Sequence, residues 1–335
     1  MHSTTTPLSL STDESLFTHS NDELGYSIYV AILDDNFSCS IGGCRFKSYP
    51  SDVAAANDAI LLARAMANKA NVHDLPHGGA KAVINVKNSD TKKEDILKDF
   101  ALEINKLKGR YVTAIDVGTS PKDMDFVQQF SPYVCSTSEY PHASSMTALG
   151  VYSSIKASCE HYLSKSLNSV KVSIQGAGNV GYDLIALLRR HTKDIVFTDV
   201  CEEKIARVLH DFPDITYVEP DEIFEQKVDV FSPCALGSVI NSHTLPKLNT
   251  KIVCGAANNQ LASLSMDSFL AERGITYVPD YLANGGGLIY VSNHYRGLNM
   301  ENVRAEVEKI YTKCLLLMRD ASLNGDTLLS HIQSR

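Results

Sequence analysis

The sequence contains no long hydrophobic run, and none of its uncharged apolar stretches approaches the roughly eighteen residues that a membrane-spanning helix needs. We therefore expect no membrane partner. The sequence also has no block of like charge, and its formal net charge of -8 argues against nucleic acid as a partner. Residues 1–7 lack a basic segment followed by an apolar core, so we expect no secretion signal.

The sequence also lacks a paired-cysteine motif, because its eight cysteines are scattered and no two of them form a C-x-x-C pair. Zinc ribbons and redox-active dithiols are therefore not expected. His73 and His77 lie four residues apart, and we interpret them as exposed loop residues rather than metal ligands, so no metal site is expected. Cysteines in apolar stretches, such as Cys254, are typical of buried, reduced thiols, which indicates a cytoplasmic protein.

A chain of 335 residues is long for a single hydrophobic core and suits two domains. The first third mixes expected strands (26–33, 82–86 and 109–115) with expected helices (51–69 and 94–104). Ser11-Thr-Asp-Glu14 matches a capping box, which predicts a short helix there as well. From Thr147 onward, short apolar runs alternate with helix-length segments, a pattern typical of a parallel, doubly wound α/β sheet.

Three glycines, Gly176, Gly178 and Gly181, form a G-x-G-x-x-G motif between an expected strand at 170–174 and an expected helix at 182–190. In that setting glycines allow a tight turn, close approach of a dinucleotide pyrophosphate, and contact between helix and sheet. The residues between the glycines complete the expected cofactor loop: Ala177, Asn179 and Val180.

Asp199 ends the next expected strand, twenty-one residues after Gly178. A carboxylate at this position accepts hydrogen bonds from both ribose hydroxyls and repels a 2′-phosphate, which favours NAD over NADP. The alternative interpretation is a glycine turn that binds no ligand, followed by a surface aspartate.

Two lysines and an aspartate stand beside glycines or at the ends of expected elements: Lys69, Lys81 and Asp116. Oxidative deamination of an amino acid needs a cation for the substrate carboxylate, a base for water, and a proton relay at nitrogen. One lysine could bind the carboxylate, and the other could act as the base if burial and a neighbouring cation lower its pKa. Without further context, such charged residues are more typical of a solvated surface.

The chain resembles the glutamate/leucine/phenylalanine/valine dehydrogenase family, and its leucine dehydrogenase branch in particular. One stretch that carries the resemblance is Gly-Arg-Tyr-Val-Thr-Ala-Ile-Asp-Val-Gly-Thr at residues 109–119. The other matching stretches follow in family order: residues 41–45, 123–125, 147–152, 175–182, 233–237, 255–261 and 279–287.

The resemblance implies a substrate-binding and catalytic domain at residues 1–142, joined by a C-terminal helix at about 300–335, and a Rossmann NAD-binding domain at 143–299. It also implies a cleft between the domains that closes on the substrate. By resemblance, Lys69 would bind the substrate carboxylate, Lys81 would be the general base, and Asp116 would pass the proton at nitrogen.

The resemblance also implies how the nicotinamide end of the cofactor is held. Thr147 and Asn284 would bind the nicotinamide amide, and Ala235 and Asn258 would lie along the nicotinamide ribose. From the sequence alone, turn or helix capping is the alternative for Asn258, and Asn284 with the glycines that follow it is equally typical of a turn.

The residues that match the family's side-chain pocket are all apolar: Ile41, Ala114, Leu288 and Val291. Gly42 and Gly43 would border the substrate. The glutamate enzymes of the family have a lysine at the Ile41 position, and its absence argues against glutamate because a second carboxylate would be left unpaired. We therefore expect a branched-chain L-amino acid as substrate. The alternative is an aromatic amino acid, phenylalanine or tryptophan, which a flexible pocket could admit, and without the resemblance four apolar residues indicate ordinary core.

Other positions depart from the leucine dehydrogenase pattern. Ile115 stands where that branch has glutamate, and Cys44 stands where it has threonine. The tail beyond Asp320 is short for the branch, and tail segments in this family help to build larger assemblies, so we expect a homo-oligomer, with a dimer favoured over an octamer. A non-catalytic NAD-binding regulatory protein is a further alternative, against which the intact set of two lysines and an aspartate argues.

Overall fold

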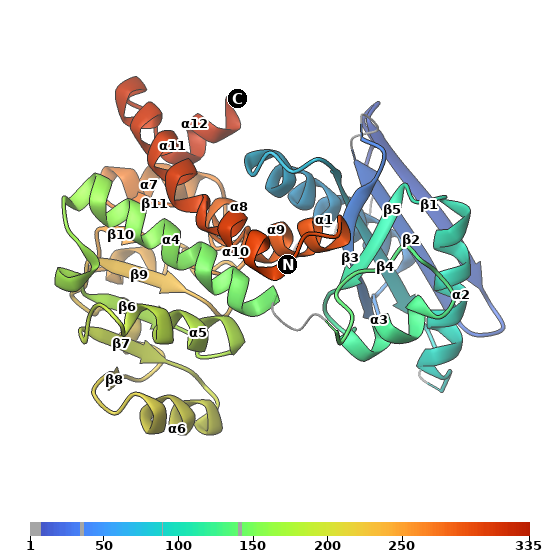
Figure 1. Ribbon diagram of the computed structural model, residues 1–335, viewed down its shortest axis with the longest axis horizontal. Helices are drawn as coiled ribbons and strands as arrows, with labels where there is room; N and C mark the ends of the chain where they lie inside the picture. Colours follow the sequence, from blue (N-terminus) through green and yellow to red (C-terminus); the bar gives the residue numbers. More distant parts are fainter. Residues whose placement is uncertain (1–7, 34–36, 89, 140–142) are drawn as a thin grey trace. The chain divides into compact units, whose positions relative to one another are not determined.

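The computed structural model describes residues 8–33, 37–88, 90–139 and 143–335, so most of the Ser/Thr-rich start lies outside the described residues. The chain divides into two compact units, Met1–Pro141 and His142–Arg335, and each is built around its own sheet (Figure 1). The predicted α/β class with a parallel, doubly wound sheet is confirmed.

The sheet of the first unit has the strand order β1-β2-β4-β3-β5. Its strands are β1 (Glu14–Asn21), β2 (Tyr26–Leu33), β3 (Ser40–Lys47), β4 (Gly78–Val86) and β5 (Tyr111–Ile115). Strand β3 runs parallel to both of its neighbours, β4 and β5, whereas β2 is antiparallel to β1 and β4. The helices are α1 (Asp52–Val72), α2 (Lys93–Lys106) and α3 (Pro121–Gln128).

Helices cover both faces of this sheet, which explains why β2 is buried along nearly its whole length and is mostly apolar. Because successive side chains point to opposite faces, Ile28, Val30 and Ile32 join the core beneath α2 and α3. Tyr29 and Ala31 join the core beneath α1. The sequence reads as a continuous apolar run because each face has its own helix layer to bury.

The helix predicted at Ser11 is wrong, because Glu14 begins β1 instead. The capping-box residues form a turn: the amide of Ser11 donates to the Glu14 carboxylate at 2.8 Å, and the amide of Glu14 donates to the Ser11 carbonyl at 3.2 Å. The carboxylate also accepts from Arg64 of α1 at 2.6 and 2.8 Å. Pairing of the following residues with β2 therefore outweighs the local helix signal.

The second unit has a six-stranded sheet in the order β11-β10-β9-β6-β7-β8, and every described pair is parallel. Its strands are β6 (Val172–Gln175), β7 (Ile195–Thr198), β8 (Thr216–Tyr217), β9 (Val230–Pro233), β10 (Ile252–Val253) and β11 (Thr276–Tyr277). The chain winds outward from β6 to β8, then returns to β9 on the other side. Ligands of such sheets bind where the strand order reverses, at the carboxyl ends of β6 and β9.

The helices of this unit surround the sheet and continue to the end of the chain (Figure 1). They are α4 (Ala143–Leu163), α5 (Asn179–Leu188), α6 (Glu202–Asp211), α7 (Ser265–Glu272), α8 (Asp280–Ala283), α9 (Gly286–Tyr295), α10 (Met300–Glu308), α11 (Ile310–Asn324) and α12 (Leu328–Gln333). The expected single C-terminal helix is therefore divided into three, with breaks at Lys309 and at residues 325–327.

The terminal helices also differ from expectation in the unit they belong to. We expected them to join the first domain, whereas the structure groups them with the second unit. The apolar stripe of α11 packs on α4: the Cys314 thiol lies 3.3 Å from the Ser154 hydroxyl, and Ile310 lies beside Gly150. Burial against the long helix α4 thus decides where the tail lies.

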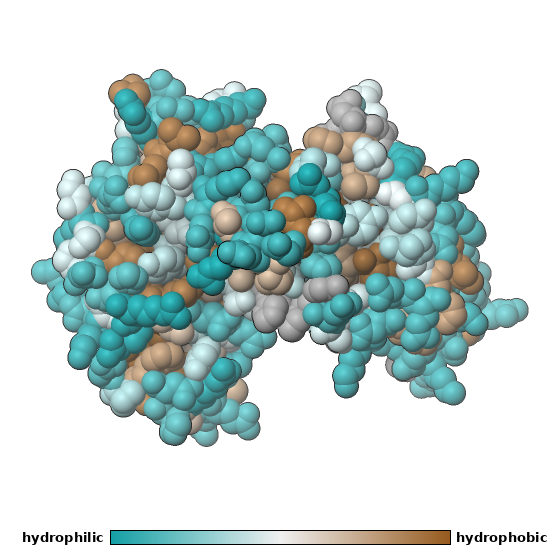
Figure 2. All heavy atoms as spheres, in the orientation of Figure 1, coloured by the Kyte–Doolittle hydropathy of each residue, from teal (hydrophilic) through white to brown (hydrophobic). Residues whose placement is uncertain are grey.

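The described helices include none that is long and apolar enough to cross a membrane. Figure 2 shows hydrophilic residues over most of the surface in view, with hydrophobic residues in separate patches.

Candidate active site

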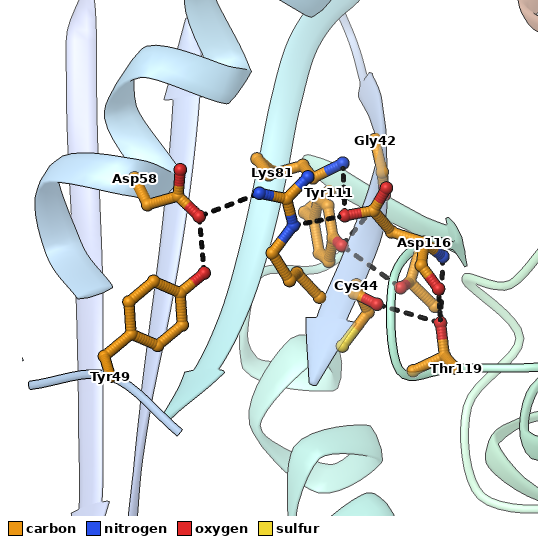
Figure 3. Close-up of polar contacts among 10 residues, drawn as sticks. Gly42, Cys44, Tyr49, Asp58, Lys81, Tyr111, Asp116 and Thr119 are labelled. Atoms are coloured by element: carbon orange, nitrogen blue, oxygen red, sulfur yellow. Dashed lines mark hydrogen bonds and ion pairs between the residues drawn. The ribbon is translucent and has the colours of Figure 1, made fainter. Parts of the chain in front are cut away.

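Lys81 and Asp116, which the sequence analysis singled out, lie together in the first unit (Figure 3). Lys81 is in β4, and Asp116 directly follows β5. The Lys81 Nζ atom is 3.0 Å from Asp116 Oδ2. Only 6% of Lys81 is exposed, so this ammonium is buried and its charge needs the carboxylate as a partner.

Arg45, for which no role was predicted from the sequence, completes this cluster. Its Nε atom is 2.7 Å from the same oxygen, Asp116 Oδ2, and its Nη1 atom is 3.0 Å from Asp58 Oδ2. The hydroxyl of Tyr49 also donates to Asp58 Oδ2. A signal was present, since Arg45 ends the matched stretch 41–45. Its meaning depends on the sheet order, in which β3 lies between β4 and β5.

Strand alternation explains why these side chains converge. Val83 of β4 packs beneath α1, so Lys81, two residues earlier, points to the same face of the sheet. Cys44 of β3 belongs to the core on the opposite face, so Arg45 points toward α1. The ion pair from Arg45 to Asp58 of α1 agrees with this assignment. The face beneath α1 therefore carries the charged cluster.

The cluster shifts the pKa values of its members. Burial lowers the pKa of Lys81, and the nearby Asp116 carboxylate offsets this only in part, while Arg45 lowers it further. Burial by itself would raise the pKa of Asp116, but Lys81 and Arg45 outweigh that effect and hold it below the ordinary value. A lysine that loses its proton more readily beside an ionised carboxylate can act as a base.

The loop that carries Asp116 is fixed on β3. The Asp116 amide donates to the Thr119 hydroxyl at 2.9 Å, and that hydroxyl donates to the Cys44 carbonyl at 2.9 Å. Gly118 has a φ of +81°, and a Cβ atom there would lie 1.9 Å from the Phe46 carbonyl oxygen. The turn is therefore closed by a hydroxyl and a glycine, and it presents the carboxylate in one position.

Gly42 and Gly43 allow the strands to approach one another closely. A Cβ atom at Gly42 would lie 1.6 Å from the Ala80 carbonyl oxygen, and one at Gly43 would lie 2.6 Å from the Ile115 carbonyl oxygen. The buried Tyr111 hydroxyl donates to the Gly42 carbonyl at 2.9 Å. These contacts explain both glycines by packing, and their predicted place beside the substrate stays a prediction.

Lys69 lies in the last turn of α1 and is half-buried. The helix is held directly against β4, because a Cβ atom at Gly79 would lie 2.0 Å from the Ala67 amide nitrogen. Lys69 thus belongs to the helix that covers the Lys81 face of the sheet. Its predicted contact with a substrate carboxylate stays a prediction.

The predicted pocket residues are buried in the two units. Ile41 of β3 and Ala114 of β5 are 2% and 8% exposed, and Leu288 and Val291 of α9 are 7% and 8% exposed. Their joint role in binding a substrate side chain stays a prediction.

The interpretation of His77 as an exposed loop residue is wrong. His77 is buried, and its Nδ1 atom lies 2.9 Å from the Gly78 carbonyl oxygen, while His73 is half-buried at the end of α1. In the part of the chain that the structure describes, no three His, Cys, Asp or Glu residues form a group that could hold a metal ion.

The glycine motif of the second unit connects β6 to α5, as predicted. Gly176 has a φ of +99° and packs against Ala235, which follows β9, at the point where the strand order reverses. A Cβ atom at Gly181 would lie 1.9 Å from the Gly176 carbonyl oxygen. Gly178 is different, because a Cβ atom there would meet nothing within 4 Å.

The open side of Gly178 is a suitable place for a pyrophosphate. Gly178 is the N-cap of α5, and no side chain of the described residues caps this helix end. The first amides of α5, including those of Asn179 and Val180, therefore present hydrogen-bond donors and the positive end of the helix dipole. These residues fit a dinucleotide phosphate.

Asp199 directly follows β7 and is tied to the same loop. One of its oxygens accepts from the Ala177 amide at 2.7 Å, and the other accepts from the Cys201 amide at 2.9 Å. The carboxylate is therefore fixed beside the glycine motif, where a ribose of the cofactor would lie.

Asn284 ends α8 and joins two segments of the second unit. Its Nδ2 atom donates to Asn258 Oδ1 at 2.8 Å and to the Ala256 carbonyl at 3.0 Å. Its Oδ1 atom is buried and has no hydrogen-bond partner among the described residues. A carboxamide NH₂, such as that of nicotinamide, would satisfy this acceptor. Thr147, in α4, donates its hydroxyl to the Ala143 carbonyl at 2.9 Å.

Comparisons with known proteins give matches in both units. Residues 21–132 match the family described as Glu/Leu/Phe/Val dehydrogenase, dimerisation domain, and residues 198–322 match Glutamate/Leucine/Phenylalanine/Valine dehydrogenase. An L-tryptophan dehydrogenase of Nostoc punctiforme is 39% identical over 319 residues, which covers 94% of this chain and 89% of that protein.

A leucine dehydrogenase and a solved crystal structure are also similar to this chain. The leucine dehydrogenase of Bacillus subtilis strain 168 is 36% identical over 303 residues, covering 89% of this chain and 83% of that protein. The crystal structure of L-tryptophan dehydrogenase from Nostoc punctiforme superposes with a TM-score of 0.83 and 35% identity, covering 96% of this chain and 93% of that chain.

Proposed function

We propose that this chain catalyses NAD-dependent oxidative deamination of an apolar L-amino acid. The chain belongs to the Glu/Leu/Phe/Val dehydrogenase family and is an oxidoreductase acting on amino acids. The reaction is reversible and converts the amino acid, water and NAD⁺ to a 2-oxo acid, ammonium, NADH and a proton. The observation that carries the proposal is the buried Lys81 Nζ atom at 3.0 Å from Asp116 Oδ2.

The side chains of the first unit supply the proton transfers. When bound, the nicotinamide cofactor accepts the hydride that leaves the substrate Cα. Lys81, in its neutral form, removes a proton from the water that attacks the resulting imine carbon. Asp116 receives and returns the proton at the substrate nitrogen, so that ammonia can leave. Lys69 holds the substrate carboxylate throughout by charge.

The cofactor would be held by the second unit. Gly178 and the first amides of α5 bind the pyrophosphate, and Asp199 binds the ribose and selects NAD over NADP by repelling a 2′-phosphate. Asn284 and Thr147 hold the nicotinamide amide, with Ala235 and Asn258 along its ribose. The unsatisfied Oδ1 atom of Asn284 supports this assignment.

The substrate is a branched-chain amino acid, because the proposed pocket residues are apolar and no lysine replaces Ile41. Glutamate is not favoured, because its side-chain carboxylate would lack the cation that a lysine at position 41 would supply. An aromatic amino acid is the second candidate, and the similarity to L-tryptophan dehydrogenases favours it. One methylene more or less in such a pocket changes substrate preference by only about 1–3 kcal/mol, and a substrate panel separates the two candidates.

A panel of amino acids with NAD or NADP, followed by absorbance of the reduced cofactor, tests the proposal. Turnover of leucine, valine or isoleucine with NAD is the expected result. Turnover restricted to phenylalanine or tryptophan would replace the substrate assignment and retain the reaction. Absence of turnover with every amino acid would overturn the proposed function.

We also infer that the enzyme is a cytoplasmic homodimer. The matched N-terminal family domain is described as a dimerisation domain, and all eight cysteines are free thiols. Light scattering of the purified protein should give twice the mass of one chain, and a mass of eight chains would contradict the inference.

A further inference from the structure

Asp116 is held through one of its two oxygens. Oδ2 receives both cations, Lys81 at 3.0 Å and Arg45 at 2.7 Å. Oδ1 takes part in neither of these ion pairs, and the Asp116 side chain is 20% exposed. A carboxylate can accept at both oxygens, so this arrangement leaves one of them available to a ligand.

Arg45 reaches two carboxylates from different elements. Its Nε atom binds Asp116, after β5, and its Nη1 atom binds Asp58 of α1 at 3.0 Å. Figure 3 shows Asp58 on the far side of the cluster from Asp116, with Tyr49 beside it. The planar guanidinium matches this task because its donors point in fixed directions, which a lysine ammonium cannot reproduce.

We propose that Arg45, anchored by Asp58, is a positioning residue of the active site, which occupies Oδ2 of Asp116 and thereby presents Oδ1 to the amino group of the substrate. The proposal rests on the proposed function. It gives Arg45 and Asp58 a part in the reaction, in addition to the roles already proposed for the two lysines and the glycine motif.

The charges around Lys81 support this role. The groups that face Lys81 are Arg45 from β3 and Asp116 after β5, and Asp58 of α1 faces Arg45, while the Cys44 thiol lies on the opposite face of β3. Arg45 lowers the pKa of Lys81 by repulsion and also lowers the pKa of Asp116 by attraction. Burial alone would lower the pKa of Arg45, but the two carboxylates outweigh burial and keep this guanidinium charged. The Arg45 cation therefore favours neutral Lys81 and ionised Asp116, which are the forms that the proposed reaction needs.

The sign of the expected pH effect follows from these contacts. Amino acid oxidation requires neutral Lys81, so activity rises with pH through the pKa of Lys81. Replacing Arg45 by a neutral residue removes a repulsion from the Lys81 ammonium, and the pKa of Lys81 then rises. The acid limb of the pH profile of kcat/KM should therefore move to higher pH.

The experiment compares Arg45→Gln, Arg45→Lys and Asp58→Asn with the wild type, using the amino acid that the panel identifies. For Arg45→Gln we expect kcat/KM at neutral pH to fall roughly 10- to 100-fold and to recover partly at high pH. Arg45→Lys keeps the charge and should shift the pH limb less, while losing activity through the missing second contact. Asp58→Asn should shift the limb least. NADH binding, followed by the fluorescence of NADH, should be unchanged in all three.

Arg64→Gln is a matched control, because Arg64 of α1 is 37% exposed at the side chain and pairs with Glu14 rather than with a member of the cluster. It should retain the wild-type pH profile. Chemical rescue separates positioning from folding: added guanidinium ion should restore part of the activity of Arg45→Ala but not of Lys81→Ala.

The outcomes are distinguishable. An inactive wild type would overturn the proposed function, and the role of Arg45 with it. An active wild type with an unchanged pH limb in Arg45→Gln, or an equal loss at every pH without rescue, would overturn the role of Arg45 alone.

Discussion

In the first unit the polar groups of the candidate site are already paired with one another, whereas in the second unit the polar backbone groups at the glycine turn are left open. Lys81, Arg45, Asp116 and Asp58 form a chain of ion pairs under α1. At Gly178, by contrast, a side chain would meet nothing within 4 Å, and no side chain caps α5 in the described part of the chain.

The difference indicates two ways of preparing a binding site. A buried cluster of charges fixes the protonation states of its members, so it is sensitive to a change of charge and to pH. A glycine turn at a helix N-terminus offers neutral amides, so it is sensitive to added volume and not to pH. Substitutions in the two units should therefore fail in different ways.

The largest effect is expected for Lys81→Ala, which removes the proposed base from the charged cluster. Its kcat should fall about 10²- to 10⁴-fold, the range typical of a lost general base. NADH fluorescence should show cofactor binding unchanged, because Lys81 lies in the other unit. Retention of full turnover would remove Lys81 from the mechanism.

Two glycines of one motif test the second half of the comparison. Gly178 has a φ of -66°, which any residue can adopt, so Gly178→Val should fold but should fill the place of the pyrophosphate. We expect NAD affinity to fall about 100-fold, equivalent to about 2.7 kcal/mol.

Gly181→Ala is the variant for comparison, because the new Cβ atom would lie 1.9 Å from the Gly176 carbonyl oxygen. It should lower the free energy of unfolding by about 1–3 kcal/mol, more than Gly178→Val does. Thermal melting measures the difference. Equal destabilisation by both variants would contradict the distinction between a ligand-facing and a packing glycine.

A smaller effect, on the preference for NAD over NADP, is expected from replacing Asp199, the charged residue beside the glycine motif. Asp199→Asn keeps a hydrogen-bonding side chain but removes the repulsion of a 2′-phosphate. The ratio of kcat/KM for NAD to that for NADP should fall about 10-fold, a change of about 1.4 kcal/mol. An unchanged ratio would show that Asp199 only ties the loop through the Ala177 amide.

The smallest effect is expected for Glu14, whose ion pair with Arg64 lies in the first unit outside the cluster. The bond from Arg64 lowers the pKa of Glu14 from 4.5 to about 2. A carboxylate with a lowered folded-state pKa stabilises the protein above its unfolded pKa, and this stabilisation is lost as pH falls from 4.5 toward 2.

Glu14→Gln should therefore lower the free energy of unfolding by about 1 kcal/mol at neutral pH and less near pH 3. Urea unfolding at both pH values measures this, with activity unchanged. Altered activity would mean that charges outside the cluster also reach the site.

The sequence predicted much of this arrangement because several signals are local. The glycine motif was interpretable since a strand precedes it and a helix follows it. Lys81 and Asp116 were recognised beside glycines and at a strand end, and the structure brings them together. What the sequence could not give is the order of strands in a sheet, and Arg45 was missed because its importance comes from β3 lying between β4 and β5.

Two errors have a similar cause. Ser11 to Glu14 has the local pattern of a helix start, but pairing with β2 makes it the beginning of a strand. The C-terminal residues were expected on the first domain, but contacts with α4, such as that of Cys314 with Ser154, 160 positions away in the sequence, hold them in the second unit. In both cases a distant partner decides the outcome.

The pH dependence of amino acid oxidation by the wild-type enzyme tests the central claim most directly. If the buried Lys81 beside Asp116 and Arg45 is the base, kcat/KM for the preferred amino acid should rise through an apparent pKa below 10.5, the ordinary value for lysine. A profile that rises only at or above that value, or does not change with pH, would contradict the account.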